Sequence, residues 1–135
     1  MKKKKLIIYP ANRWAEELLT YSRLKRTEFL VEDQENIDEA NRRWGGIKHV
    51  ISFNDFVKTV HDPNEYVIII SDTSRYQECA GKLSLFGFAE NTHFFNGWKL
   101  DKAFYSMNKE YLDWYGFETG ENYDIEENKY SYFAA

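Results

Sequence analysis

Hydroxyl-bearing and cationic residues follow Val67–Ile70, the most apolar run of the chain. Ser71, Thr73 and Arg75 stand there, and hydroxyls with a guanidinium can together hold a phosphate or a sugar. Helix capping explains the serine equally well, so both interpretations stay open. Arg13, near the start of the chain, is a candidate for the same ligand, or it simply faces water.

No arrangement of residues indicates catalysis or metal binding. His49, His61 and His93 lie far apart and lack the spacing of a metal site. Cys79, the single cysteine, is expected to be a small core residue on a helix. The sequence contains no Ser-His-Asp order, nucleophile elbow or Walker loop. We therefore predict neither a catalytic residue nor a metal ligand.

Charge and hydropathy argue against two classes of partner. The formal net charge is −4, which disfavours general binding to nucleic-acid backbones. The basic run Lys2–Lys5 precedes a predicted strand and is interpreted as a solvated edge. No apolar run approaches the length of a membrane span, and no signal-peptide pattern follows the lysines. Because a single cysteine allows no internal disulfide, we predict a cytoplasmic protein.

The elements that must position these side chains alternate between strand and helix. Apolar runs predict strands at residues 4–9, 28–31, 47–51, 66–70 and 92–95. Apolar spacing and caps predict helices at about 12–24, 37–44, 53–60, from the 71–74 caps to 86, and 100–114. Such alternation requires crossover connections. We therefore predict an α/β, Rossmann-like three-layer domain with a mostly parallel sheet of about five strands.

Length and composition set the domain organisation. The 135 residues suffice for one domain with a sizeable core. Aromatic residues make up 18% of the chain and are expected to fill that core or to form a partner surface. After Gly116 the composition becomes acidic and tyrosine-rich. We predict a Rossmann-like domain at residues 1–116 and a tail or linker at residues 117–135.

The opening of the chain, Ile8–Leu18, resembles that of a known family. It is similar to the Rossmann-like domains at the front of sugar-modifying enzymes. Such domains precede sugar O-acyltransferase domains of the sialic-acid acetyltransferase type or accompany FkbM-type methyltransferases. The similarity continues through the following segments: Phe29–Asp33, Gly46-Ile47 with Val50–Ser52, Tyr66–Ser71 and Leu85–Phe88. It covers roughly residues 4–97 and specifies the fold far better than the ligand.

The dinucleotide fingerprint of Rossmann domains is altered in this chain. Its three glycine positions fall on Pro10, Asn12 and Ala15. Proline restricts the tight turn and asparagine stands where a diphosphate approaches the backbone, whereas alanine is tolerated. We therefore expect no ordinary NAD or FAD binding, although the helix N-terminus can still hold a phosphate or carboxylate. Glu32 or Asp33 stands where an acidic residue accepts ribose hydroxyls, and the alternative is a solvated acidic loop.

The resemblance implies a non-catalytic accessory domain of a sugar- or polysaccharide-modifying protein. Its expected ligand is a nucleotide-sugar or a similar anion between the loops at Pro10, Glu32 and Ser71, and its expected partner is an adjacent catalytic domain. The alternative is a protein-interaction or oligomerisation module that has lost its ligand site. The turn containing Pro10 and Asn12 and the tyrosine-rich end favour that alternative. No cofactor is assigned.

Overall fold

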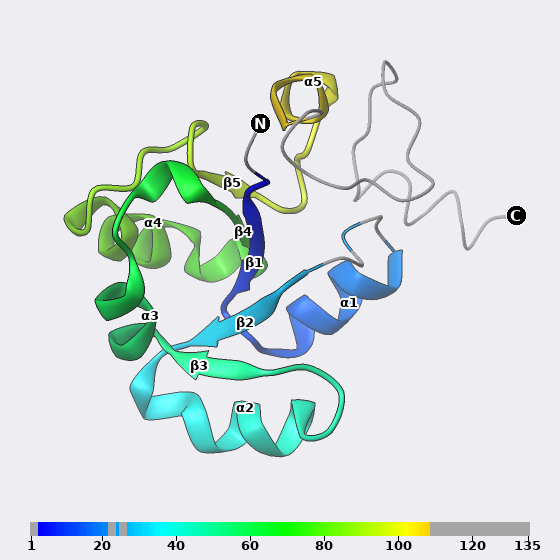
Figure 1. Cartoon of the computed structure of the whole chain (residues 1–135). Coiled ribbons are helices and arrows are strands. Elements are labelled where there is room, and N and C mark those ends of the chain that lie inside the picture. Colours follow the sequence, from blue (N-terminus) through cyan, green and yellow to red (C-terminus); the bar gives the residue numbers. More distant parts are fainter. Residues whose placement is uncertain (1–2, 22–23, 25–26, 109–135) are drawn as a thin grey trace, which may run out of the picture.

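The computed structural model describes residues 3–21, 24 and 27–108, and it contains a five-stranded sheet covered by helices on both faces (Figure 1). The strands are β1 (Lys5–Tyr9), β2 (Phe29–Glu32), β3 (Val50–Ser52), β4 (Tyr66–Ile70) and β5 (Phe94–Asn96). The α-helices are α1 (Arg13–Tyr21), α2 (Ile37–Trp44), α3 (Phe53–Thr59), α4 (Tyr76–Leu85) and α5 (Lys102–Asn108). Short 3-10 helices are η1 (Gln34–Asn36), η2 (Pro63–Glu65) and η3 (Thr73–Arg75).

β1 lies at the centre of the sheet, whose strand order is β3-β2-β1-β4-β5. All neighbouring strands run parallel, and Ile7 of β1 lies opposite both Phe29 of β2 and Ile68 of β4. The chain moves outward from β1 to β3 and then returns to the other side of β1 as β4. The strand order therefore reverses between β1 and β4, where such sheets usually bind ligands. The predicted α/β fold with a parallel sheet is confirmed.

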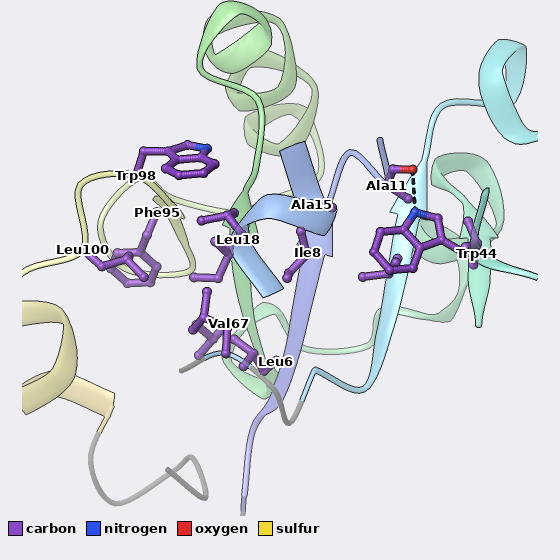
Figure 2. Close-up of a cluster of buried hydrophobic side chains, with 14 of the residues drawn as sticks. Leu6, Ile8, Ala11, Ala15, Leu18, Trp44, Val67, Phe95, Trp98 and Leu100 are labelled. Atoms are coloured by element: carbon purple, nitrogen blue, oxygen red, sulfur yellow. Dashed lines mark hydrogen bonds between the residues drawn. The ribbon is translucent and has the colours of Figure 1, made fainter. Parts of the chain in front are cut away.

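Side chains that alternate along the strands build one core on each face of the sheet. On the first face, Leu6, Ile8 and Val67 lie in one apolar cluster with Leu18 of α1 and Trp44 of α2 (Figure 2). All five are almost completely buried. The apolar spacing of α1 thus faces the sheet, as expected for an amphipathic helix.

The second face is dominated by aromatic rings. The ring of Phe56 on α3 lies 5.3 Å from that of Tyr66 and 6.0 Å from those of Phe29 and Phe88. Cys79 of α4 is fully buried in the same cluster. The cysteine is therefore a core residue, as predicted, and aromatic residues fill much of this core.

β3 begins three residues later than the sequence predicts, the largest difference at the start of a strand. We expected a strand from residue 47, but β3 begins at Val50. The amides of Ile47 and Lys48 instead donate to the Trp44 carbonyl at 2.8 and 3.1 Å, which closes a turn after α2. Gly46 permits this turn with a φ of 78°. Ile47 and Lys48 therefore belong to the connection, whereas the His49 carbonyl already accepts the amide of Leu30 on β2 at 2.9 Å.

The helix predicted after β4 is divided in two. η3 comes first, because the Asp72 carboxylate accepts the Ser74 amide at 3.0 Å and caps this short turn. α4 follows and ends at Leu85. Gly87 has a φ of 90°, in agreement with its predicted role at the end of the helix.

Residues 109–135 lie outside the described part of the chain. The predicted tail at 117–135, the domain boundary at residue 116 and the predicted end of the last helix all fall there. Among the residues that are described, no helix is both long enough and apolar enough to cross a membrane.

Candidate functional site

The carboxyl ends of β1 and β4 are joined by hydrogen bonds. The Ser71 amide donates to the Tyr9 carbonyl at 2.9 Å, and the Ser71 hydroxyl donates to the Pro10 carbonyl at 2.6 Å. Pro10 follows a cis peptide bond, and both Pro10 and Ser71 are buried. The serine hydroxyl therefore bridges the two loops at the place where the strand order reverses.

Asn12 extends this bridge with both ends of its amide. Its Oδ1 accepts the Trp14 backbone amide at 3.0 Å and caps α1, while its Nδ2 donates to the Asp72 carboxylate at 2.9 Å. Because this carboxylate stands beside the N-terminus of α1, a phosphate there would meet a negative charge. We refer to the contacts among four residues as the seam: Pro10, Asn12, Ser71 and Asp72.

The loop after β5 packs against the seam. The Trp98 indole N–H donates to the Ser71 carbonyl at 2.5 Å. A Cβ on Gly97 would lie 2.6 Å from Ile69 Cγ2 and 2.7 Å from Leu18 Cδ1, which is closer than side-chain carbons approach. Glycine is therefore required for this loop to reach the seam.

Asp33, directly after β2, is held inside the protein. Its Oδ1 accepts from the Tyr9 hydroxyl and the Lys82 ammonium, both at 2.6 Å, and its Oδ2 accepts from Arg75 at 2.6 Å. Burial by itself would raise the pKa of Asp33. The hydrogen bonds from Lys82 and Tyr9, with the charges of Lys82 and Arg75, outweigh burial, so this pKa lies below its usual range. Asp33 therefore stays ionised and is occupied by donors from the protein itself.

Glu32, the last residue of β2, behaves in the opposite way. Burial raises the pKa of its carboxyl group. The Asp33 amide, which donates to Glu32 at 2.8 Å, and the charge of Arg75, whose guanidinium lies 3.5 Å away, act in the other direction but do not outweigh burial. Glu32 is therefore protonated more readily than an ordinary glutamate.

A crevice of about 200 Å³ opens between the loop after β1, the end of β2, and α2. Its polar lining consists of Asn12, Glu32, Asn36, Glu39, Arg43 and Arg75. Trp44 donates its indole N–H to the Ala11 carbonyl at 2.9 Å, which fixes α2 against the loop after β1 (Figure 2). We refer to this opening as the β1–β2 crevice.

The two arginines of the crevice are held with different strength. Arg75 contacts the buried carboxylates of Glu32 and Asp33 and forms a fixed wall. Arg43 lies 3.1 Å from Glu16 and 4.0 Å from Glu39, whose side chains are 46% and 69% exposed. Ion pairs with exposed partners are weak. A ligand can therefore recruit Arg43 at little cost.

Five of the candidate residues from the sequence are brought together at this edge of the sheet. Pro10 and Ser71 are buried in the seam. Glu32 and Arg75 line the crevice, and Asn12 belongs to both regions. The loops expected to surround a ligand are therefore adjacent, but two of the five residues contact each other and do not line the opening.

The other three candidates do not line the crevice. Asp33 is fully buried behind it. The Arg13 side chain is 65% exposed, with Glu17 4.0 Å away and its guanidinium 5.0 Å from the Trp14 ring. Thr73 is exposed in η3. Arg13 and Thr73 thus face solvent.

The contribution of α2 and its preceding turn to the crevice is not among the predictions from the sequence. Asn36, Glu39 and Arg43 line the crevice from positions that share one helical face. This spacing is present in the sequence, but polar and charged residues at such positions are equally typical of a helix face that contacts only water. Lys82 was also missed, because nothing near it in sequence marks a partner 49 residues away at Asp33.

Across residues 3–21, 24 and 27–108, no group of histidine, cysteine, aspartate and glutamate side chains is arranged to hold a metal ion. Burial raises the pKa of the Cys79 thiol to about 12. A thiol with this pKa is protonated at neutral pH and is a poor nucleophile.

The crevice groups can hydrogen-bond to hydroxyls and pair with an anionic group. Comparisons with known protein families, curated proteins and solved structures found no match to this chain. A functional assignment therefore depends on the chemistry of the crevice.

Proposed function

We propose that the chain is a non-catalytic Rossmann-like accessory domain of a sugar- or polysaccharide-modifying protein, and that it binds a nucleotide-sugar or a similar anion. The supporting observation is the β1–β2 crevice, where Glu32, Asn36 and Arg43 surround one opening. Carboxylate and amide groups bind sugar hydroxyls, and a guanidinium binds an anionic group. The link to sugar modification comes from the resemblance of the Ile8–Leu18 opening.

The volume of the crevice limits how much of the ligand it encloses. About 200 Å³ is less than the roughly 300–1,000 Å³ of sites that enclose drug-sized ligands. It equals the liquid volume of about seven water molecules. In this proposal one sugar ring enters the crevice. The phosphates lie outside the seam, because Asn12 and Asp72 hydrogen-bond to each other there.

Anion binding is expected to use Arg43 more than Arg75. Arg75 is already paired with buried carboxylates, so moving it would leave Asp33 without one of its donors. Arg43 contacts partners that can return to water. The ligand's anionic group therefore replaces Glu16 at Arg43, while Glu32 accepts a hydroxyl.

Isothermal titration calorimetry with UDP-, GDP- and CDP-sugars, NAD and S-adenosylmethionine tests the proposal. We expect at least one nucleotide-sugar to bind. Arg43→Gln should weaken that binding about 10–100-fold, since a hydrogen bond to a charged group contributes about 1.5–3 kcal/mol. Arg42→Gln changes the neighbouring exposed arginine of α2 and should bind like the unmodified chain. Absence of binding to every compound at high micromolar concentration would contradict the proposal.

A second function, protein interaction or self-association, is favoured by a different surface. Leu85 and Phe86 follow each other at the end of α4 and are 83% and 49% exposed. The Phe86 ring lies 5.6 Å from that of Phe53, so it extends the aromatic core outward. Exposed apolar patches mark contact surfaces more often than isolated apolar residues do.

Sedimentation velocity over a range of concentrations tests self-association through this surface. We expect association that Leu85→Ser weakens. Ile47→Ser, at an apolar residue that is 72% exposed elsewhere on the molecule, should leave it unchanged. A chain that is monomeric at every concentration would contradict self-association.

A further inference from the structure

His93 connects separate parts of the second face of the sheet. Its carbonyl accepts the amide of Ile68 on β4 at 2.8 Å. Its ring Nδ1 accepts the Ala89 amide at 2.9 Å, and its Nε2 lies 2.8 Å from Oδ1 of Asn64 on η2. The residue is 9% exposed, and its ring is 6.0 Å from that of Phe88. The imidazole therefore joins the turn before β5 to the turn before β4.

These contacts determine which ring nitrogen carries the proton. A backbone amide only donates, so Nδ1 must offer its lone pair to Ala89. The Asn64 Oδ1 only accepts, so Nε2 must carry the hydrogen. The neutral imidazole makes both bonds. A protonated imidazole would instead direct a second N–H against the N–H of Ala89.

Charged groups of two neighbouring segments act on the ring. Burial lowers the pKa of His93, and Lys4, just before β1, lowers it further, whereas Asp62, just before η2, raises it. The folded pKa lies below the unfolded value of about 6.5. The contribution of neutral His93 to the free energy of unfolding is therefore complete above about pH 6.5. It is lost as the pH falls from there toward the folded pKa.

The turn held by His93 also forms part of a second cavity. The Ala89 carbonyl accepts the amides of Thr92 and His93 at 3.2 and 2.9 Å, which closes the turn. Glu90 and Asn91, at its tip, line a cavity of about 520 Å³ beside β5. Asn91 has a φ of 60°, and its amide donates to the Phe94 carbonyl at 2.9 Å, so it forms the tip of the turn.

We propose that His93 is a proton-operated latch on the turn that carries Glu90 and Asn91. Protonation removes the acceptor of the Ala89 amide, so the turn is loosened at this end and this wall of the cavity moves, while the backbone bonds to the Ala89 carbonyl remain. The Tyr76 hydroxyl, which donates to Glu90 at 2.6 Å, transmits the movement to the start of α4. Acidification thus reshapes a surface that is separate from the β1–β2 crevice, so the inference does not depend on the proposed ligand.

Nitrogen-15 NMR of the full chain tests the protonation state directly. We expect His93 near neutral pH to carry hydrogen on Nε2 alone. Its titration midpoint should lie below the unfolded value of about 6.5. Exchange of the Ala89 amide, corrected for its intrinsic pH dependence, should accelerate about tenfold on protonation, the factor for losing one ordinary hydrogen bond.

His93→Gln supplies a matched variant, because glutamine offers a donor and an acceptor but does not titrate. It should abolish the pH-dependent amide shifts of Glu90 and Asn91, whereas His61→Gln should preserve them. A hydrogen on Nδ1 at neutral pH, or unchanged pH-dependent shifts in His93→Gln, would overturn the proposal. The ring measurement uses the unmodified chain and decides the matter even where a variant does not fold.

Discussion

The seam and the β1–β2 crevice lie at the same edge of the sheet, yet their polar groups are used in opposite ways. In the seam, Ser71 hydrogen-bonds to Pro10, and Asn12 hydrogen-bonds to Asp72, so these groups contact each other. In the crevice, Arg43 has exposed partners and stands beside an opening of about 200 Å³. The loop after β1 contributes to both regions, so the difference comes from what lies opposite that loop.

This contrast separates the role of topology from that of side chains. The strand order reverses between β1 and β4, and topology alone would place a ligand there. Ser71 and Asp72 after β4 instead bond to the loop after β1. The opening is found one strand further along, beside β2 and α2. The fold therefore determines the edge, and a few polar side chains determine which part of that edge is accessible.

Removing the Asp33 carboxylate, which holds Arg75 in the wall of the crevice, should have the largest effect on stability. In Asp33→Ala, Arg75 and Lys82 lose their buried partner. We expect the free energy of unfolding to fall by about 3 kcal/mol, the lower part of the range for breaking a buried ion pair, because both cations can still reach water. Urea denaturation measures this. Asp38→Ala, at an exposed position of α2, should change stability by less than about 0.5 kcal/mol.

Adding one methyl group beneath the seam should have the next largest effect. Gly97→Ala would place a Cβ 2.6 Å from Ile69 Cγ2 and 3.0 Å from the Ile70 carbonyl, so we expect a loss of about 1–3 kcal/mol. Gly81→Ala is the matched control, because nothing lies within 4 Å of a Cβ there. On α4 it should raise stability by about 0.5–1 kcal/mol. Equal effects of the two substitutions in urea denaturation would contradict close packing at Gly97.

Removing a hydrogen bond of the seam should lower the free energy of unfolding somewhat less than Gly97→Ala does. Ser71→Ala removes the hydroxyl that donates to the buried Pro10 carbonyl, and we expect a loss of about 1–2 kcal/mol. Ser74→Ala removes a hydroxyl bond to Asp72 at an exposed position and should cost less than about 0.5 kcal/mol. Thermal and urea unfolding compare the two variants. Similar losses of stability would mean that the hydrogen bond in the seam contributes no more than one in an exposed surface turn.

The pH dependence of stability should give the smallest effect and should distinguish Glu32 from Asp33. The folded pKa of Glu32 is raised, so its stability contribution is lost as the pH rises from its unfolded value through the folded value. The folded pKa of Asp33 is lowered, so its contribution is lost as the pH falls through that value. Urea unfolding from about pH 3 to pH 7 measures the free energy of unfolding as a function of pH. Glu32→Gln should remove the decrease with rising pH that Glu32 causes and should preserve the decrease with falling pH that Asp33 causes. An unchanged pH profile would contradict the raised pKa.

The fold could be predicted from the sequence because its signals are local. Leu6–Ile8 and Val67–Ile70 are unbroken apolar runs, as parallel strands covered on both faces require. The alternation of these runs with helical segments then requires parallel connections. The start of β3 was wrong because the hydrogen bonds of Ile47 depend on the turn at Gly46. Apolar character alone does not reveal such a turn.

The candidate site could be predicted only in part because its contacts are not local. From the sequence, either Glu32 or Asp33 is expected to accept ribose hydroxyls, or both to stand in a solvated acidic loop; the loop interpretation is wrong, because both residues are buried. Successive side chains leave a strand on opposite faces, so Glu32 lines the crevice while Asp33 turns toward α4. Lys82, the partner of Asp33, lies on α4 and is distant from Asp33 in the sequence. Arg43 reaches the crevice because α2 is oriented with this residue toward the opening. Neither contact can be read from residue types alone.

The short length of the outer strands has a consequence for association between molecules. Within the described residues the sheet ends at β3 and β5, and each has three residues. Such short edge strands expose few unpaired amides and carbonyls, so a strand of another molecule has little edge with which to pair. The folded protein is therefore expected to resist amyloid-like stacking through its sheet, even though it contains the highly β-prone run Val67–Ile70, because that run is buried inside the sheet between β1 and β5.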